Sequence, residues 1–224
     1  MEKNNFGLNL WVNLKKLLMD EFENHYKKYK NNKYEGSKLF LNSVIKNRNS
    51  FLNFTKVNNL NYGSFAGLLL EWSFKFAIDN CILLNKKENE LEVINKYKLP
   101  YKWKEKGTNY VNIDAVLKLK KSTKVLICLE IKTNFEDGFS KYYKEQNLIY
   151  HHRKKTFSDF KYHYIAFSKI PSKFTLNLDN KRKVNTLTQR KQLWILPINK
   201  IDNELIINRC VELLENIYGI IENY

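Results

Sequence analysis

The chain has 224 residues, enough to bury a hydrophobic core without disulfides, and its 43% hydrophobic and 28% charged residues exclude a disordered or fibrous protein. Lysine and arginine number 39 against 23 aspartate and glutamate, and the net charge of +16 predicts a polyanionic partner, foremost nucleic acid. Three widely separated cysteines and the lack of a long apolar stretch argue against a disulfide framework and a membrane span, so we expect a cytoplasmic protein. A genome rich in A and T is an alternative source of part of the lysine excess.

The first part of the chain is expected to be helical. Apolar residues at helical spacing predict an amphipathic helix over residues 9–29 and a shorter helix over 37–48. Residues 47–64 are rich in asparagine, which favours loops and turns. Ser64 is a suitable N-cap for a helix over 65–82, which is apolar on nearly every side, as a helix buried in a core would be.

The rest of the chain alternates between extended and helical patterns. Turn-like stretches separate three extended segments that should pair as an antiparallel meander: 91–98, 109–119 and 124–133. The later elements are expected to be a helix over 138–155, a strand over 162–168, an irregular basic stretch to residue 190, a strand over 192–198 and a helix over 204–221. This order predicts a single α/β domain with a mixed central sheet flanked by helices.

Two of these strands carry ionisable residues in otherwise apolar sequence. In residues 125–132, VLICLEIK, the two-residue period of a strand puts Glu130 and Lys132 on the same face. Asp114 is the one acid within 109–119. If the two segments form a hairpin, Asp114 lies opposite Glu130 and Lys132, within side-chain reach for strands about 4.8 Å apart.

The chemistry that suits these residues is cleavage of a phosphodiester. Two carboxylates this close would repel each other unless a cation lay between them. Mg²⁺ is held in proteins by one or two carboxylates and by water, so the pattern predicts a magnesium site. Such a site can polarise a phosphate oxygen, and Lys132 can position the attacking group or neutralise charge in the transition state. The alternative is a structural ion pair at the surface.

An acid on one strand, followed by acid-x-Lys on the next, resembles the PD-(D/E)xK nuclease superfamily; the matching residues are Asp114, Glu130 and Lys132, with Ile113 in place of the proline. The resemblance implies a restriction-endonuclease-like core, with a helical N-terminal part (about 1–63) and a catalytic core (about 64–198). It also implies a Mg²⁺ ion held by Asp114, Glu130 and the backbone carbonyl of Ile131. A stand-alone chain of this kind is most similar to a type II restriction endonuclease, a homodimer that cuts double-stranded DNA at a specific sequence. Alternatives are a repair or recombination nuclease or an exonuclease of the same superfamily, and a non-catalytic basic DNA-binding protein.

Three further residues are candidates by the same resemblance. Glu71 lies in an apolar helix before the strands, where it is expected to bind or orient a metal; the alternative is an ion pair with Lys75 one helical turn away. Gln146 and Tyr150 match a Gln-x-x-x-Tyr pattern of the RecB branch and are expected to position phosphate. The alternative is an ordinary amphipathic helix, which also places a polar and an aromatic residue on one face.

Basic residues near the end of the chain are candidates for DNA binding. Arginine, glutamine and asparagine make bidentate contacts to base edges, and lysine mostly meets phosphate. The candidates on the basic stretch are Lys181, Arg182, Lys183, Gln189, Arg190 and Lys191, with Arg153 and Lys154 at the end of the preceding helix. The alternatives are an ordinary basic loop and a solvated helix end, where positive charge also complements the helix dipole.

Overall fold

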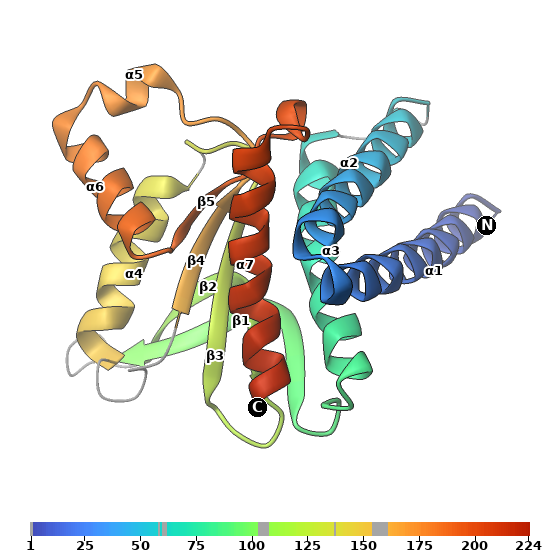
Figure 1. The fold of residues 1–224 in the computed structure, drawn as a ribbon, viewed down its shortest axis with the longest axis horizontal. Coiled ribbons are helices and arrows are strands. Elements are labelled where there is room, and N and C mark those ends of the chain that lie inside the picture. The colour runs from blue at the N-terminus through green and yellow to red at the C-terminus, as the bar shows by residue number, and fades with distance from the viewer. Residues whose placement is uncertain (1, 58, 60–61, 103–107, 137, 154–160) are drawn as a thin grey trace.

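The computed structural model describes residues 2–57, 59, 62–102, 108–136, 138–153 and 161–224 (Figure 1). It contains one five-stranded mixed sheet flanked by helices, which confirms the expected α/β class. In chain order the elements are α1 (Glu2–Asn31), α2 (Lys33–Val57), α3 (Tyr62–Leu84), β1 (Leu91–Lys102), β2 (Thr108–Leu119), β3 (Val125–Lys132), α4 (Phe139–Arg153), β4 (Lys161–Ala166), α5 (Ser172–Thr175), α6 (Leu178–Gln189), β5 (Leu193–Ile195), the short 3-10 helix η1 (Ile198–Lys200) and α7 (Glu204–Asn223).

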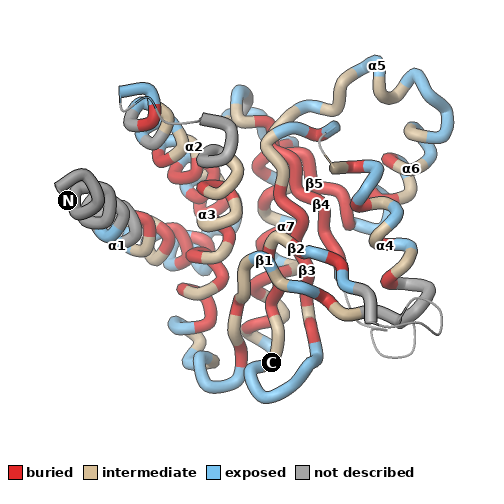
Figure 2. Tube along the Cα trace, turned by 180° about the vertical axis from the view of Figure 1, so that it is seen from behind, coloured by how far each residue is buried: buried red, intermediate tan, exposed pale blue. Residues whose placement is uncertain are grey.

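Helices cover both faces of the sheet. One hydrophobic cluster joins α1, α2, α3 and α7 to one face, through strand residues such as Ile127 and Leu129. A second cluster joins α4 and α6 to the other face and includes Cys128, Tyr142 and Leu187. Figure 1 shows α7 running across the front of the sheet, and Figure 2 shows from behind how much of the central strands is buried. The N-terminal helices therefore share a core with the sheet.

Strand pairing changes beside Asp114. β1 and β2 pair antiparallel, β2 and β3 pair antiparallel, and β4 and β5 follow in parallel, so the predicted meander is confirmed. The pairs between β2 and β3 end at Ala115 opposite Leu129, whereas β3 pairs with β4 as far as Lys132 opposite Ala166. The β1–β2 hairpin therefore separates from β3 at the level of Asp114, and the sheet opens there.

The expectation of a loop over residues 47–64 is wrong for most of that stretch. α2 continues to Val57, and Asn47 is buried within it, where its amide donates to Oε2 of Glu21 on α1 at 2.8 Å. This packing outweighs the weak helix propensity of asparagine. α3 begins at Tyr62, so Ser64 lies inside the helix and is not its N-cap.

The basic stretch up to residue 190 is also more regular than its composition predicts, because it forms α5 and α6. Oδ1 of Asn177 caps α6 by accepting hydrogen bonds from the backbone N–H of Asp179 at 2.9 Å and of Asn180 at 3.3 Å. Val184 and Leu187, one helical turn apart, bury the inner face of α6. Only two of the twelve residues of α6 are buried apolar residues, and they give only a weak helical periodicity in the sequence.

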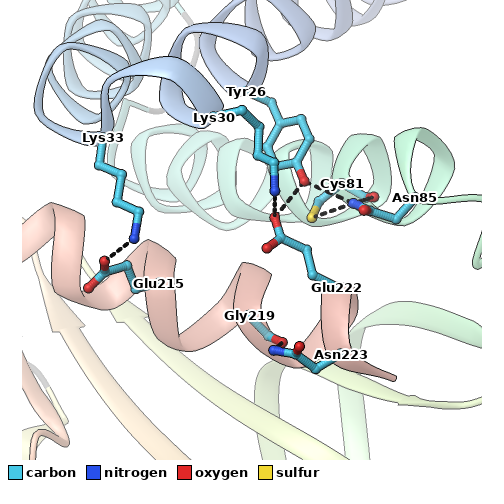
Figure 3. A network of polar contacts seen from close by, with 9 residues as sticks. All are labelled: Tyr26, Lys30, Lys33, Cys81, Asn85, Glu215, Gly219, Glu222 and Asn223. Carbon is cyan, nitrogen blue, oxygen red and sulfur yellow. Dashed lines mark hydrogen bonds and ion pairs between the residues drawn. The ribbon is translucent and has the colours of Figure 1, made fainter.

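A polar network holds α1 against α3 and α7 (Figure 3). Tyr26 Oη donates to Oε1 of Glu222 at 2.7 Å, and Nζ of Lys30 lies 3.0 Å from the same oxygen. Asn85, in the turn directly after α3, donates to Tyr26 Oη at 2.9 Å, so α1, α7 and the end of α3 meet at one hydroxyl. The cysteines are free and buried, as expected for a fold without disulfides. Among the helices in the described ranges, none combines the length and apolar character that crossing a bilayer requires.

Candidate active site

Asp114, Glu130 and Lys132 meet where the β1–β2 hairpin leaves β3. Nζ of Lys132 lies 2.8 Å from Oδ2 of Asp114 and 2.8 Å from Oε1 of Glu130. The same oxygen of Asp114 accepts a hydrogen bond from the backbone N–H of Ile131 at 2.8 Å. Continuing the β2–β3 register by one residue sets Asp114 opposite Glu130. The structure thus brings together the two acids and the lysine that strand alternation places near one another.

These three side chains are largely withdrawn from solvent. The exposed fraction is 4% for the side chain of Glu130, 19% for Asp114 and 23% for Lys132. Burial raises the pKa of Glu130, and repulsion by Asp114 raises it further. Burial alone would lower the pKa of Lys132, but attraction by Glu130 and Asp114 outweighs it, so the pKa lies above its ordinary value. Lys132 is therefore a protonated donor between two acids.

Glu71 on α3 is electrostatically part of the same cluster. Burial raises its pKa to about 7; Asp114 raises it as well, while Lys132 and Lys96 lower it. Its Oε2 is buried without a hydrogen-bond partner among the described residues. The alternative of an ion pair with Lys75 does not form, because that lysine lies 2.6 Å from Asp79 instead. Glu71 thus places a further carboxyl group beside the centre, and it forms no ion pair with any described residue.

The pKa of Glu71 predicts a pH-dependent change in stability. An unfolded glutamate ionises near its ordinary pKa of 4.5, whereas folded Glu71 stays protonated up to about 7. The wild-type chain therefore loses stability as pH rises from about 4.5 to about 7, and Glu71→Gln should not. We expect the variant to unfold with a free energy roughly 1–2 kcal/mol higher at pH 8, after allowance for solvent screening, and with little gain at pH 4.

Chemical denaturation at the two pH values, without divalent ions, measures this gain. Glu90→Gln is the matched control, because Glu90 is exposed at the surface and the same substitution there should change the free energy of unfolding little. An equal gain for Glu71→Gln at pH 4 and pH 8 would contradict the prediction.

Polar groups from β4 and from α4 lie on the Glu130 side of the centre. Tyr162 Oη donates to Oε2 of Glu130 at 3.3 Å. Gln146 is fully buried, and neither of its amide atoms has a hydrogen-bond partner in the described part of the chain. The side chain of Tyr150, its expected companion, lies outside the described residues. Glu145 was not anticipated from the sequence, where nothing distinguishes it from other charged helix residues.

Glu145 is partly buried beside this centre. Its side chain is 15% exposed and lies 3.5 Å from Nζ of Lys141. Burial raises the pKa of Glu145, and repulsion by Glu130 contributes to the rise. α4 therefore adds a further acid on the Glu130 side.

Gly138 gives Lys132 the room it occupies. Its φ of +89° favours glycine, and a Cβ built there would lie 3.2 Å from Cε of Lys132. Gly138→Ala is therefore expected to destabilise the protein by roughly 1–3 kcal/mol and to displace Lys132. Thermal unfolding measures the loss of stability. Gly67→Ala is the control, since a Cβ there meets nothing within 4 Å and alanine favours a helix; equal stability of the two variants would contradict the prediction.

The expected DNA-binding residues lie on and after α6. Five of them are exposed: Lys181, Arg182, Gln189, Arg190 and Lys191. Lys183 forms an ion pair with Asp179 and lies 5.3 Å from the centre of the Tyr143 ring. The side chain of Arg153 and all of Lys154 are outside the described residues. The structure therefore gathers most of the predicted cations on one helix and the turn after it.

Aromatic packing ties the segment before α6 to the loop that follows Lys132. The ring of Phe174 on α5 lies 5.1 Å from that of Phe135 and 5.3 Å from that of Phe139, edge to face in both cases. Lys173 forms an ion pair of 3.6 Å with Glu136. The backbone N–H of Phe135 donates to Oγ of Ser168 at 2.6 Å. The α5–α6 segment is thus fixed relative to the candidate centre.

The donor set suits a hard cation. The described residues hold no ready-made group of three or more His, Cys, Asp or Glu arranged around a metal. The ammonium of Lys132 contacts both acids. Asp114 and Glu130 nevertheless offer carboxylate oxygens side by side, and the buried Oε2 of Glu71 still has a lone pair to donate. Mg²⁺ takes one or two carboxylates and keeps water for its other positions. The residues present therefore fit Mg²⁺.

Comparison of the chain with models of protein families, with curated proteins and with solved structures gave no match.

Proposed function

We propose that the protein is a Mg²⁺-dependent endonuclease that hydrolyses double-stranded DNA at Asp114, Glu130 and Lys132. One observation carries the proposal: Lys132 contacts the carboxylates of both Asp114 and Glu130, which are largely shielded from solvent, at the point where β2 separates from β3. Burying such charges is unfavourable unless they are paired or used, and here two acids share a single lysine. An excess of acids beside one cation is the arrangement that a divalent ion would complete.

Each residue has a distinct role in this proposal. Asp114, Glu130 and the backbone carbonyl of Ile131 would hold Mg²⁺, with Glu71 as a further ligand. When bound, the ion would polarise the phosphate and make water more acidic. Lys132 would donate a hydrogen bond to the phosphate or the attacking group and neutralise charge in the transition state. Its raised pKa argues against a role as the general base.

The same proposal has three further parts. The fold has a restriction-endonuclease-like core, the enzyme cuts at a specific DNA sequence, and it acts as a homodimer. The exposed cations of α6 and of the turn after it would contact the duplex. A dimer with twofold symmetry would meet a palindromic site and cut both strands. A cytoplasmic location is consistent with three free cysteines.

A second candidate is a repair or recombination nuclease, or an exonuclease, of the same superfamily. The observation in its favour is Gln146, whose buried amide lacks partners among the described residues and could meet a phosphate. An exonuclease requires DNA ends, whereas an endonuclease cuts a closed circle. The two candidates therefore differ in the substrate that they accept.

Incubation with closed circular plasmid DNA tests the proposal directly. With Mg²⁺ we expect cutting of the circle into discrete fragments, and with EDTA we expect none. Sequencing of the fragment ends would give the target and the stagger. Degradation of linear DNA alone would favour the exonuclease, and binding without Mg²⁺-dependent cleavage would leave a non-catalytic DNA-binding protein.

A further inference from the structure

Two leucines project from the corner between α5 and α6. The exposed fraction is 83% for Leu176 and 73% for Leu178. Single exposed leucines are common on protein surfaces, but these two flank one residue, Asn177, at a tight corner. Exposing two large apolar side chains together is unfavourable in water, so this corner is suited to contact with another molecule.

The corner is held firmly in place. Asn177 between the two leucines caps α6, and Phe174 packs edge to face on Phe135 and Phe139. Phe135 lies only three residues beyond Lys132. The backbone that carries the two leucines is therefore fixed relative to the candidate centre. Side chains that contact a substrate during cleavage need such a fixed position.

The charges around the corner identify the occupant. Residues 169–191 contain a single acid, Asp179, and it is paired with Lys183. Five exposed cations of this segment form no ion pair within the described part of the chain: Lys169, Lys181, Arg182, Arg190 and Lys191. Such a field attracts a polyanion, whereas it would repel the same cationic segment of a second copy of the chain.

We propose that Leu176 and Leu178 form an apolar wedge that packs against the bases of duplex DNA while the surrounding cations hold the phosphates. Apolar side chains inserted at base steps are a known way to bend a duplex and to read its deformability. The cations alone would hold any sequence equally, because phosphate contacts carry no base information. The inference rests on the proposed function, since it assumes that duplex DNA is the substrate.

Binding of a short duplex that contains 2-aminopurine at several positions tests the wedge, with Ca²⁺ in place of Mg²⁺ to limit cutting. The full-length wild type should raise the fluorescence of the analogue, because its base becomes unstacked. The double variant Leu176→Ala with Leu178→Ala should lose this rise and bind roughly tenfold or more weakly. Its salt dependence of binding should equal that of the wild type, since no phosphate contact has been removed.

Two control variants separate the wedge from general effects. Leu205→Ala removes another exposed leucine, on α7, and should bind like the wild type. Lys181→Ala with Arg182→Ala should weaken binding and reduce its salt dependence.

If the wild type does not bind duplex DNA, both the wedge and the proposed function are wrong. If the wild type binds and the leucine variant matches it in affinity and fluorescence, the wedge alone is wrong. Sedimentation measures whether the leucine variant is still a dimer. If the variant binds DNA more weakly only because it has lost its dimer, the wedge is wrong as well.

Discussion

Lys132→Ala is expected to slow Mg²⁺-dependent cleavage of DNA by roughly 10²- to 10³-fold while leaving DNA binding close to that of the wild type. The variant removes the ammonium that lies 2.8 Å from both Asp114 and Glu130. The exposed cations of α6 remain, so the attraction to phosphate is unchanged. Single-turnover cleavage and a gel-shift assay on the same duplex measure the two effects separately.

Lys118→Ala is the matched control for this variant. Lys118 is also a strand lysine with little exposure, and it forms an ion pair of 2.9 Å with Glu92 away from the candidate centre. Loss of that pair should affect stability slightly and cleavage not at all. If Lys132→Ala cuts as fast as Lys118→Ala, the catalytic role of Lys132 is wrong.

Asp114→Asn should abolish cleavage for a different reason, the loss of Mg²⁺ affinity. Asparagine keeps the shape of the side chain, and its oxygen can still accept the hydrogen bond from Ile131. It removes one of the negative charges that would hold the ion, so we expect binding of Mg²⁺ to weaken by at least roughly tenfold. Calorimetric titration with Mg²⁺ in the absence of DNA measures this directly.

The two variants should differ in that titration. Lys132→Ala removes the ammonium that contacts both carboxylates and should bind Mg²⁺ at least as tightly as the wild type. Asp179→Asn is a surface control, because Asp179 pairs with Lys183 on α6 and should leave Mg²⁺ binding unchanged. Equal Mg²⁺ affinity for wild type and Asp114→Asn would show that Asp114 is not a ligand.

Much of the sheet and the centre could be predicted from the sequence, because strand alternation is a strict rule. The two-residue period fixes Glu130 and Lys132 on one face whatever surrounds them. A short hairpin then limits where Asp114 can lie. The local pattern was sufficient here, since neighbouring strands are held at one spacing by their hydrogen bonds.

The parts that depend on distant contacts could not be predicted. Asparagine at position 47 favours a turn when considered locally, but its side chain is satisfied by Glu21 on another helix. Glu145 is a candidate only because α4 packs near Glu130, a contact between segments that lie apart in the sequence. The separation of β2 from β3 cannot be predicted from strand alternation. Beyond the point of separation β2 still pairs with β1 and β3 still pairs with β4, so each strand keeps its two-residue period.

The edge-to-face packing of Phe174 against Phe135 has a consequence for how DNA would be cut. Packed aromatic rings resist sliding, so the corner at α5 and the end of β3 cannot move far apart independently. The distance from that corner to the scissile phosphate would then be the same in every complex with DNA. On this view every cut falls at a constant offset from the contacted bases, and the fragment ends have one length.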